Sequence, residues 1–142
     1  MSIEENKASV RREIEECWHK GNLVVVEEIY DTNFVDHSPF PGTTPGREGI
    51  KQFIKIMRDA FPNIRLTIED LIAENDKVVE RVTAIGTNRG KFMGIAPTGK
   101  QIIVPVITIN RFIGGKIVER WSVSDQLTML QQLGVIPSQL VD

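Results

Sequence analysis

Asp125 is a carboxylate placed where a strand would meet either a cavity or a helix. It follows Lys116–Ser124, whose alternating side chains predict a β-strand. Successive side chains of a strand point to opposite faces, so Ile117, Trp121 and Val123 would share the face of Asp125. If this face lines a cavity, the carboxyl group is desolvated and can keep a proton near neutral pH, as a general acid/base must.

Asp125 fits a purely structural role equally well. Ser124 and Asp125 directly precede an apolar run with helical spacing, formed by Leu127, Leu130 and Leu133. An aspartate at this position can cap the first turn of a helix through its side-chain oxygens. Such a cap is stabilised in its charged form and would be a poor acid at pH 7. The sequence leaves both interpretations open.

His37 is a second residue whose type could serve chemistry. It follows Asp36 and has Phe34, Pro39 and Phe40 as neighbours, which is an aromatic and proline-rich setting. A histidine there could orient a substrate or share a proton with a carboxylate across a pocket. A single histidine where a strand runs into a loop can also be an ordinary turn residue with satisfied hydrogen bonds.

Further polar and aromatic side chains are candidates for holding a ligand. Arg81 lies on a predicted strand among apolar residues, where it could contact a ligand oxygen or be a surface or interface charge. Asn88 and Asn110 are similar candidates. Trp18 and Trp121 could line either a core or a pocket, because both are built from the same residue types.

Two other kinds of site are not supported. Gly94–Lys100 resembles part of a phosphate-binding loop, but Gln101 stands where Ser or Thr is required, and a strand rather than a helix follows. Two distant histidines and one cysteine give no metal-ligand spacing, so no metal site is expected. Cys17 lies on an apolar helical stripe, which indicates a core position.

Length and charge limit the classes of protein that the chain can belong to. Its 142 residues suit a single domain covering residues 1–142, and a net charge of −2 gives no footprint for nucleic acid. The apolar runs are too short to span a membrane, and the acidic N-terminus does not resemble a signal peptide. A single cysteine is compatible with a reducing cytoplasm, where we expect the protein.

The first half of the chain is expected to be helical. Ser2 and Glu5 match a capping box, and the helix that follows would end at Gly21. A second, short helix is predicted over Asn22–Tyr30. A third begins near Arg47 and is stopped by Pro62; its apolar face is Ile50, Phe53, Ile54, Met57 and Phe61.

The second half changes to a period of two, which predicts strands and then a closing helix. Because several strand residues are apolar on both faces, we expect one face to cover the helices and the other to meet a second copy in a homodimer. Helices followed by antiparallel strands make an α+β fold, with a curved sheet around a cone-shaped pocket. The predicted elements are strands over Arg65–Ala73, Lys77–Thr87, Gln101–Phe112 and Lys116–Ser124, and a helix over Gln126–Leu133.

Short motifs along nearly the whole chain carry a family resemblance. They are Gly21–Leu23, Phe34–His37, Phe61–Pro62, Asp70–Glu74, Asp76–Val78, Gly86–Thr87, Gly94–Lys100, Gly115–Glu119, and Trp121 with Asp125–Leu127. Together these motifs resemble the SnoaL-like polyketide cyclase family. That family has the cone-shaped fold of nuclear-transport-factor-2-like (NTF2-like) proteins.

The resemblance implies an enzyme that needs no cofactor and closes a ring by an intramolecular aldol reaction. It maps the general acid/base onto Asp125 and a pocket histidine onto His37, with Trp18, Phe34 and Trp121 as walls. The expected substrate is a small apolar or aromatic, polyketide-like molecule that delocalises its own enolate. A non-catalytic domain that binds an apolar ligand, or another isomerase or hydrolase on this fold, are the alternatives.

Three positions depart from the pattern of the family. Relatives often have Asp where this chain has Ser122, His where it has Asn88, and Trp where it has Val82. One carboxylate, one polar contact and one aromatic wall are therefore missing. A large anthraquinone should not be assumed as the substrate.

Overall fold

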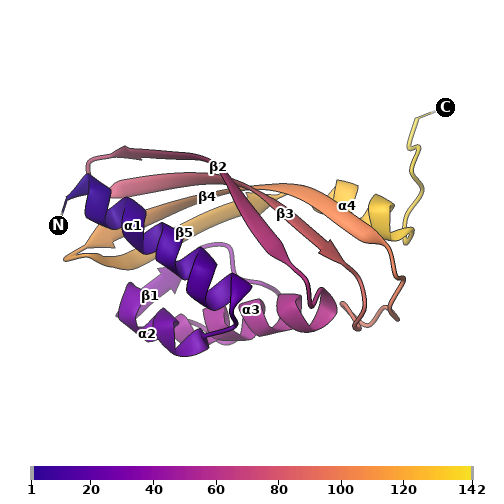
Figure 1. The fold of residues 1–142 in the computed structure, drawn as a ribbon, viewed down its shortest axis with the longest axis horizontal. Helices are drawn as coiled ribbons and strands as arrows, with labels where there is room; N and C mark the ends of the chain where they lie inside the picture. Colours follow the sequence, from indigo (N-terminus) through magenta and orange to yellow (C-terminus); the bar gives the residue numbers. More distant parts are fainter. Residues whose placement is uncertain (1, 142) are drawn as a thin grey trace.

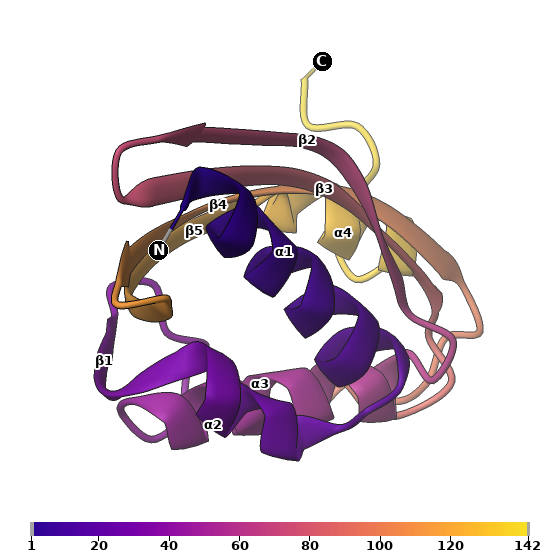
Figure 2. The ribbon, with the colours of Figure 1, turned by 60° about the vertical axis from the view of Figure 1, so that its left-hand side comes forward.

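A curved sheet wraps around helices that lie on its concave side (Figures 1 and 2). The computed structural model describes residues 2–141. Figure 2 shows α1 crossing the inside of the sheet, with α2 and α3 closing the side opposite β2 and β3. The helical elements are α1 (Ile3–Glu13), a π-helical segment (Ile14–His19), a short 3-10 turn (Leu23–Val25), α2 (Val26–Ile29), α3 (Arg47–Ala60) and α4 (Gln126–Leu133).

The sheet within residues 2–141 has five strands in the order β1-β5-β4-β3-β2. The α+β fold expected from the sequence is confirmed. The strand expected to end before His37, for which no bounds were predicted, is β1, and it pairs with β5 in parallel. The other neighbours are antiparallel. The strands are β1 (Tyr30–Asp36), β2 (Arg65–Glu74), β3 (Lys77–Thr87), β4 (Gln101–Ile113) and β5 (Lys116–Ser124).

A β-bulge at Val118 changes which side chains of β5 face the helices. Ile117 lies opposite Phe112, but Glu119 lies opposite Arg111, so Val118 is an extra residue in β5. An extra residue reverses the alternation of side chains on the two sides of the bulge. Ile117 is therefore fully buried on the concave face. Without the bulge, alternation would place Ile117 on the same face as Trp121 and Val123, which point outward.

After the bulge, β5 directs Arg120, Ser122 and Ser124 inward. Trp121 and Val123 point to the outer, convex face of the sheet, and Val123 is 76% exposed. The expectation that Trp121 shares a face with Ile117 and lines the pocket is wrong, and the bulge is the physical reason.

The helical stretch formed by α1 and the π-helical segment is held at both ends. The predicted capping box between Ser2 and Glu5 is present. At the other end, Arg58 of α3 donates a 3.0 Å hydrogen bond to the carbonyl of His19. Its guanidinium lies against Gly21, whose φ of +74° and lack of a side chain allow this approach. This contact ties α3 to the π-helical segment that carries Trp18.

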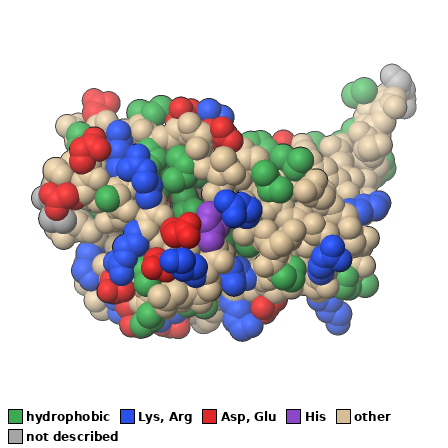
Figure 3. Space-filling model, viewed as in Figure 1, with side chains coloured by type: hydrophobic (Ala, Val, Ile, Leu, Met, Phe, Trp, Pro, Cys, Tyr) green, Lys and Arg blue, Asp and Glu red, His purple; other side chains and the backbone are tan. Residues whose placement is uncertain are grey.

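Within residues 2–141, no helix is both long and apolar enough to cross a lipid bilayer. Charged side chains of both signs are interspersed over the face seen in Figure 3, and no single basic patch dominates that face.

Candidate functional site

A pocket lies between the concave face of the sheet and the helices, where the resemblance predicts one. Its inner chamber has a volume of about 100 Å3. A second hollow of about 290 Å3, here called the mouth, lies between the loop at residues 38–41 and the end of β5. It shares Phe40, Phe53, Ser122, Ser124 and Gln126 with the wall of the inner chamber. Most of the wall is apolar, and it includes Trp18, Phe40, Phe53, Met57, Val82 and Val104.

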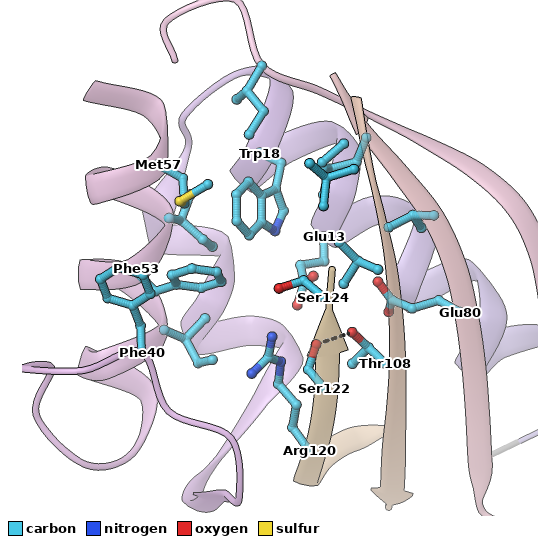
Figure 4. A pocket seen from close by; sticks show the side chains of 18 of the residues that line it. Glu13, Trp18, Phe40, Phe53, Met57, Glu80, Thr108, Arg120, Ser122 and Ser124 are labelled. Atoms are coloured by element: carbon cyan, nitrogen blue, oxygen red, sulfur yellow. Dashed lines mark hydrogen bonds between the residues drawn. The ribbon is translucent and has the colours of Figure 1, made fainter. Parts of the chain in front are cut away.

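Two carboxyl groups stand on this apolar wall. Glu13 is the last residue of α1, and Glu80 lies in the middle of β3, and both side chains extend into the pocket (Figure 4). The hydroxyl of Tyr30 donates a hydrogen bond to Glu13. The amide of Asn110, on β4, donates one to Glu80 over 2.8 Å. Both carboxyl groups are buried, so each depends on these few partners.

Burial determines how this pair holds protons. Desolvation and the neighbouring charge of Glu13 raise the pKa of Glu80 to about 8, against smaller opposing effects of Asn110 and Arg120. Burial also raises the pKa of Glu13, although Tyr30 and Arg120 oppose it. The pair therefore retains at least one proton near neutral pH, which is the state that a general acid/base needs.

Among the described residues that line the chamber, Arg120 is the one with a permanent positive charge. Its side chain reaches inward from β5 (Figure 4), and its Nη1 lies 3.1 Å from both carboxylate oxygens of Asp36 on β1. The guanidinium carbon lies 5.8 Å from the centre of the Phe53 ring, so the group also packs on an aromatic face. Asp36 and Phe53 together hold Arg120 in one orientation.

Two hydroxyls continue the polar part of the wall beside Arg120. The side chains of Thr108 and Ser122 share a 2.8 Å hydrogen bond between β4 and β5. The backbone N–H of Ser122 donates to the Ser38 hydroxyl over 2.9 Å, which attaches the loop at the mouth to β5. The inward position at which relatives often carry an aspartate is thus occupied by a neutral hydroxyl.

Asp125 takes the second of its two predicted arrangements, that of a helix cap. Its Oδ1 accepts a 3.0 Å hydrogen bond from the backbone N–H of Thr128, and its Oδ2 accepts from the Thr128 hydroxyl over 2.6 Å. These bonds hold the pKa of the exposed carboxyl below its usual range. Asp125 does not contribute to the wall of the inner chamber. The idea that it is a desolvated carboxyl on an apolar wall is wrong, and its role in catalysis stays a prediction.

His37 and Trp121 lie together, but on the convex face of the sheet. Their rings are stacked at 4.9 Å with an angle of 10° between the planes. The Nε2 atom of His37 is 2.8 Å from the carboxylate of Glu119, which also points outward. His37 is therefore separated from the chamber by the sheet itself, and neither ring belongs to the chamber wall.

Three other candidates also lie outside the chamber. Arg81 is half exposed on the convex face, where its Nε is 2.7 Å from Asp70. Asn88 accepts a hydrogen bond from the N–H of Thr98 over 2.8 Å and stabilises the loop that connects β3 to β4. Phe34 is buried behind the wall against Tyr30, with ring centres 4.8 Å apart.

Trp18 and Asn110 are the predicted site residues that do line the chamber. The sequence reasoning missed Glu13, Glu80 and Arg120. A signal for the two glutamates was present, because each interrupts an apolar pattern. Glu13 falls on the apolar stripe of the first helix, three residues after Val10, and Glu80 alternates with Val78 and Val82 on one strand face.

Candidate metal ligands and the cysteine are the remaining groups with a characteristic chemistry. Residues 2–141 contain no group of three or more His, Cys, Asp or Glu side chains with metal-binding geometry. Burial raises the pKa of Cys17 to about 12, so its thiolate is scarce at neutral pH. Acid/base chemistry by the carboxyl pair is the chemistry that this arrangement can support.

A curved sheet wrapped around helices, with an apolar pocket between them, is the arrangement of NTF2-like α+β proteins. The family model for the SnoaL-like polyketide cyclases matches residues 8–133. The chain therefore belongs to the SnoaL-like polyketide cyclase family, and the resemblance seen in the sequence is confirmed. A search of curated proteins gives no match.

Solved structures with this fold come from several bacteria. A proposed polyketide cyclase from Bacillus cereus is 32% identical, with a TM-score of 0.82 over 96% of this chain and 87% of that one. IdmH from Streptomyces antibioticus is 31% identical, with a TM-score of 0.78 over 91% and 98% of the two chains. TsrD from Streptomyces laurentii has a TM-score of 0.87 over 96% and 99%, but at 24% identity it shows the fold alone.

Proposed function

We propose that the protein is a cofactor-independent enzyme of the polyketide cyclase type that closes a ring by an intramolecular aldol reaction. The observation that carries this proposal is the pair of buried carboxyls, Glu13 and Glu80, on the wall of an apolar pocket. We assign the proton transfers to this pair because it faces the chamber and retains a proton. The fold alone would not support this proposal, since it hosts unrelated chemistries.

The reaction needs one proton to move twice. The ionised member of the carboxyl pair takes a proton from the carbon between two carbonyl groups of the substrate, which becomes an enolate. The enolate carbon then forms a bond with a second carbonyl carbon, whose π electrons move onto its oxygen. The protonated carboxyl returns the proton to this alkoxide, so the product has the same atoms as the substrate. The pocket contributes orientation, exclusion of water and a nearby acid/base.

The size of the pocket limits the substrate. A cavity of about 150 Å3 in another protein holds a benzene molecule. The inner chamber, at about 100 Å3, therefore suits the reacting end of a substrate, while the mouth, at about 290 Å3, can hold an aromatic ring. We propose a small aromatic β-dicarbonyl compound of one or two rings as the substrate.

A synthetic substrate can test this proposal directly. A methyl β-ketoester whose ketone is joined through a CH2 group to a phenyl ring with an ortho acetyl group would close a six-membered ring by an aldol reaction. After loss of water this ring becomes a fluorescent naphthol. We expect the wild-type protein to accelerate this closure. Glu80→Gln should lower the rate by about 100-fold or more, because a lost acid/base typically costs that much.

Asp125→Asn is the matched variant for the assignment implied by the family resemblance. If the carboxyl pair transfers the proton, Asp125→Asn closes the ring at nearly the wild-type rate. If instead Asp125→Asn is inactive and Glu80→Gln is not, the pair is not the acid/base.

A non-catalytic domain that binds an apolar ligand is the second candidate, since the mostly apolar chamber alone would suit it. In that case the β-ketoester would bind, as seen by quenching of Trp18 fluorescence, and would leave the pocket unchanged. Wild-type protein that binds the ketoester and does not accelerate its closure would favour this candidate.

A further inference from the structure

We propose that Arg120 forms an oxyanion site that binds the ionised oxygen of an enolate or phenolate through its Nε and Nη2 atoms. This inference rests on the proposed function, because an enolate is the intermediate of the aldol reaction. It adds the residue that would stabilise the negative oxygen, and it names the class of ligand that the pocket should prefer.

The hydrogen bonds of Arg120 leave one edge of its guanidinium available. Nη1 makes all the side-chain hydrogen bonds found for this group within residues 2–141: two to Asp36 at 3.1 Å and one to the carbonyl of Ser38 at 3.5 Å. Nε and Nη2 have no such partner among these residues. Among the described residues, the side-chain nitrogen or oxygen that is both fully buried and without a partner is Oδ1 of Asn6. Nε and Nη2 of Arg120 are therefore not fully buried. Arg120 lines the chamber and its side chain reaches into it (Figure 4), so we infer that these donors face the chamber.

Asp36 acts as a positioning residue for Arg120. The side chains of both residues are largely buried, at 11% and 12% exposure. Asp36 also accepts a 2.9 Å hydrogen bond from the backbone N–H of Ser38, so its carboxylate is itself held in place. A guanidinium fixed in this way loses little further freedom when it binds a second oxygen.

The charge balance of the pocket favours an oxyanion that forms during the reaction. The charge of Arg120 lowers the pKa of both Glu13 and Glu80, so the guanidinium acts electrostatically on the pair. When a carboxylate of the pair takes a proton from the substrate, its negative charge passes to the substrate oxygen. The number of charges in the pocket is unchanged, and Arg120 can stabilise the new anion without reorganisation.

Ser122 keeps this site from being neutralised further. It is the next inward residue on β5, about 7 Å along the strand from Arg120. The aspartate that relatives often carry at this position would add a second carboxylate beside the guanidinium, which Asp36 already neutralises once. The neutral hydroxyl of Ser122, bonded to Thr108, leaves the remaining donors of Arg120 for a ligand.

Binding of para-nitrophenol tests the oxyanion site without any turnover. Its phenolate is yellow and its neutral form is not, so absorbance of the bound probe reports its pKa. We expect the wild-type protein to lower the pKa of the bound probe below that of the probe in water. Arg120→Met should shift the ratio of phenolate to phenol at least about tenfold toward phenol, since hydrogen bonds to charged groups contribute this much.

Three variants make the interpretation specific. Ser122→Asp should also favour the neutral phenol while leaving Arg120 in place. Arg81→Met, which removes an arginine on the convex face, is the matched control and should bind the probe as the wild type does. Arg120→Lys keeps a positive charge if Arg120→Met does not fold.

The outcomes separate this inference from the proposed function. A pKa of the bound probe that is unchanged or raised in the wild type, or an absence of binding, overturns the oxyanion site. If the probe binds as phenolate but the β-ketoester is never closed, the oxyanion site stands and the aldol function fails. If ring closure depends on Glu80, but Arg120→Lys and Arg120→Met leave the pKa of the bound probe as in the wild type, the aldol function stands and the oxyanion site fails.

Discussion

The side chains of Glu80 and Asn110 meet across β3 and β4, with the amide nitrogen 2.8 Å from the carboxyl oxygen. Both residues are almost completely buried. The amide can donate to Glu80 in either protonation state, so it holds the group without forcing it to ionise. The protonation state of Glu80 is then determined mainly by burial and by the nearby charge of Glu13, which raise its pKa to about 8.

The raised pKa predicts that stability depends on Glu80 in an unusual direction. The folded state binds a proton at Glu80 up to about pH 8, whereas the unfolded chain releases it near 4.5. Between these values the folded state binds more protons, so the contribution of Glu80 to stability falls as pH rises, by about 1 kcal/mol per pH unit. Glu80→Gln should therefore be more stable than the wild type at pH 8, and the gain should shrink toward pH 5.

Urea unfolding at several pH values measures this difference. Glu74, exposed at the end of β2, offers a matched control, because Glu74→Gln changes the same group outside the pocket. A free-energy difference between wild type and Glu80→Gln that is the same from pH 5 to pH 8 would contradict the raised pKa.

The same pKa predicts the pH dependence of ring closure. Where Glu80 is the member of the pair that takes the substrate proton, it must be ionised, and a pKa of about 8 means that only a minority of Glu80 is ionised at pH 7. The rate should therefore rise about tenfold for each pH unit below that value and level off above it. Initial rates with the β-ketoester, corrected for the reaction without protein, measure this. A rate that is already constant between pH 5 and pH 7 would point to a carboxylate with an ordinary pKa.

The β-bulge at Val118 limited how much of the site could be predicted from the sequence. The periods of the sequence were enough to locate α4, β3 and β5 within their observed bounds. Alternation alone then placed Ile117 and Trp121 on one face, but the bulge at Val118 puts them on opposite faces. A bulge depends on the pairing of β5 with β4, which no local pattern reveals.

Glu13 and Glu80 show a different limit. Their apolar neighbours in the sequence are the one signal that could have shown that both face inward. The two residues are 67 positions apart in the sequence, one at the end of a helix and the other on a strand. The sequence could not show that both side chains enter the same chamber. That meeting is a property of the folded sheet and the position of α1, so the electrostatic coupling of the two carboxyls became apparent only in the structure.

Asp125 is predicted to contribute to helix stability. Asp125→Ala removes the oxygens that accept from Thr128, so we expect Tm to fall by a few degrees. Asp125→Asn keeps a capping side chain and should melt close to the wild type. Carbon NMR titration should also give Asp125 a pKa below its ordinary value of 3.8. A pKa well above 3.8 would instead support the hypothesis that Asp125 is a desolvated general acid/base, which the structure does not support.

The convex face of the sheet predicts a homodimer. Ile103, Ile107 and Val123 are 50%, 49% and 76% exposed on neighbouring strands, where a second copy could cover them. We expect sedimentation to show a dimer at micromolar concentration and Val123→Lys to shift it toward monomer, because a buried lysine without a partner is costly. Val24→Lys, at a site 61% exposed on a helical turn, is the control and should remain dimeric. A wild-type monomer under these conditions would show that the apolar convex face is left uncovered.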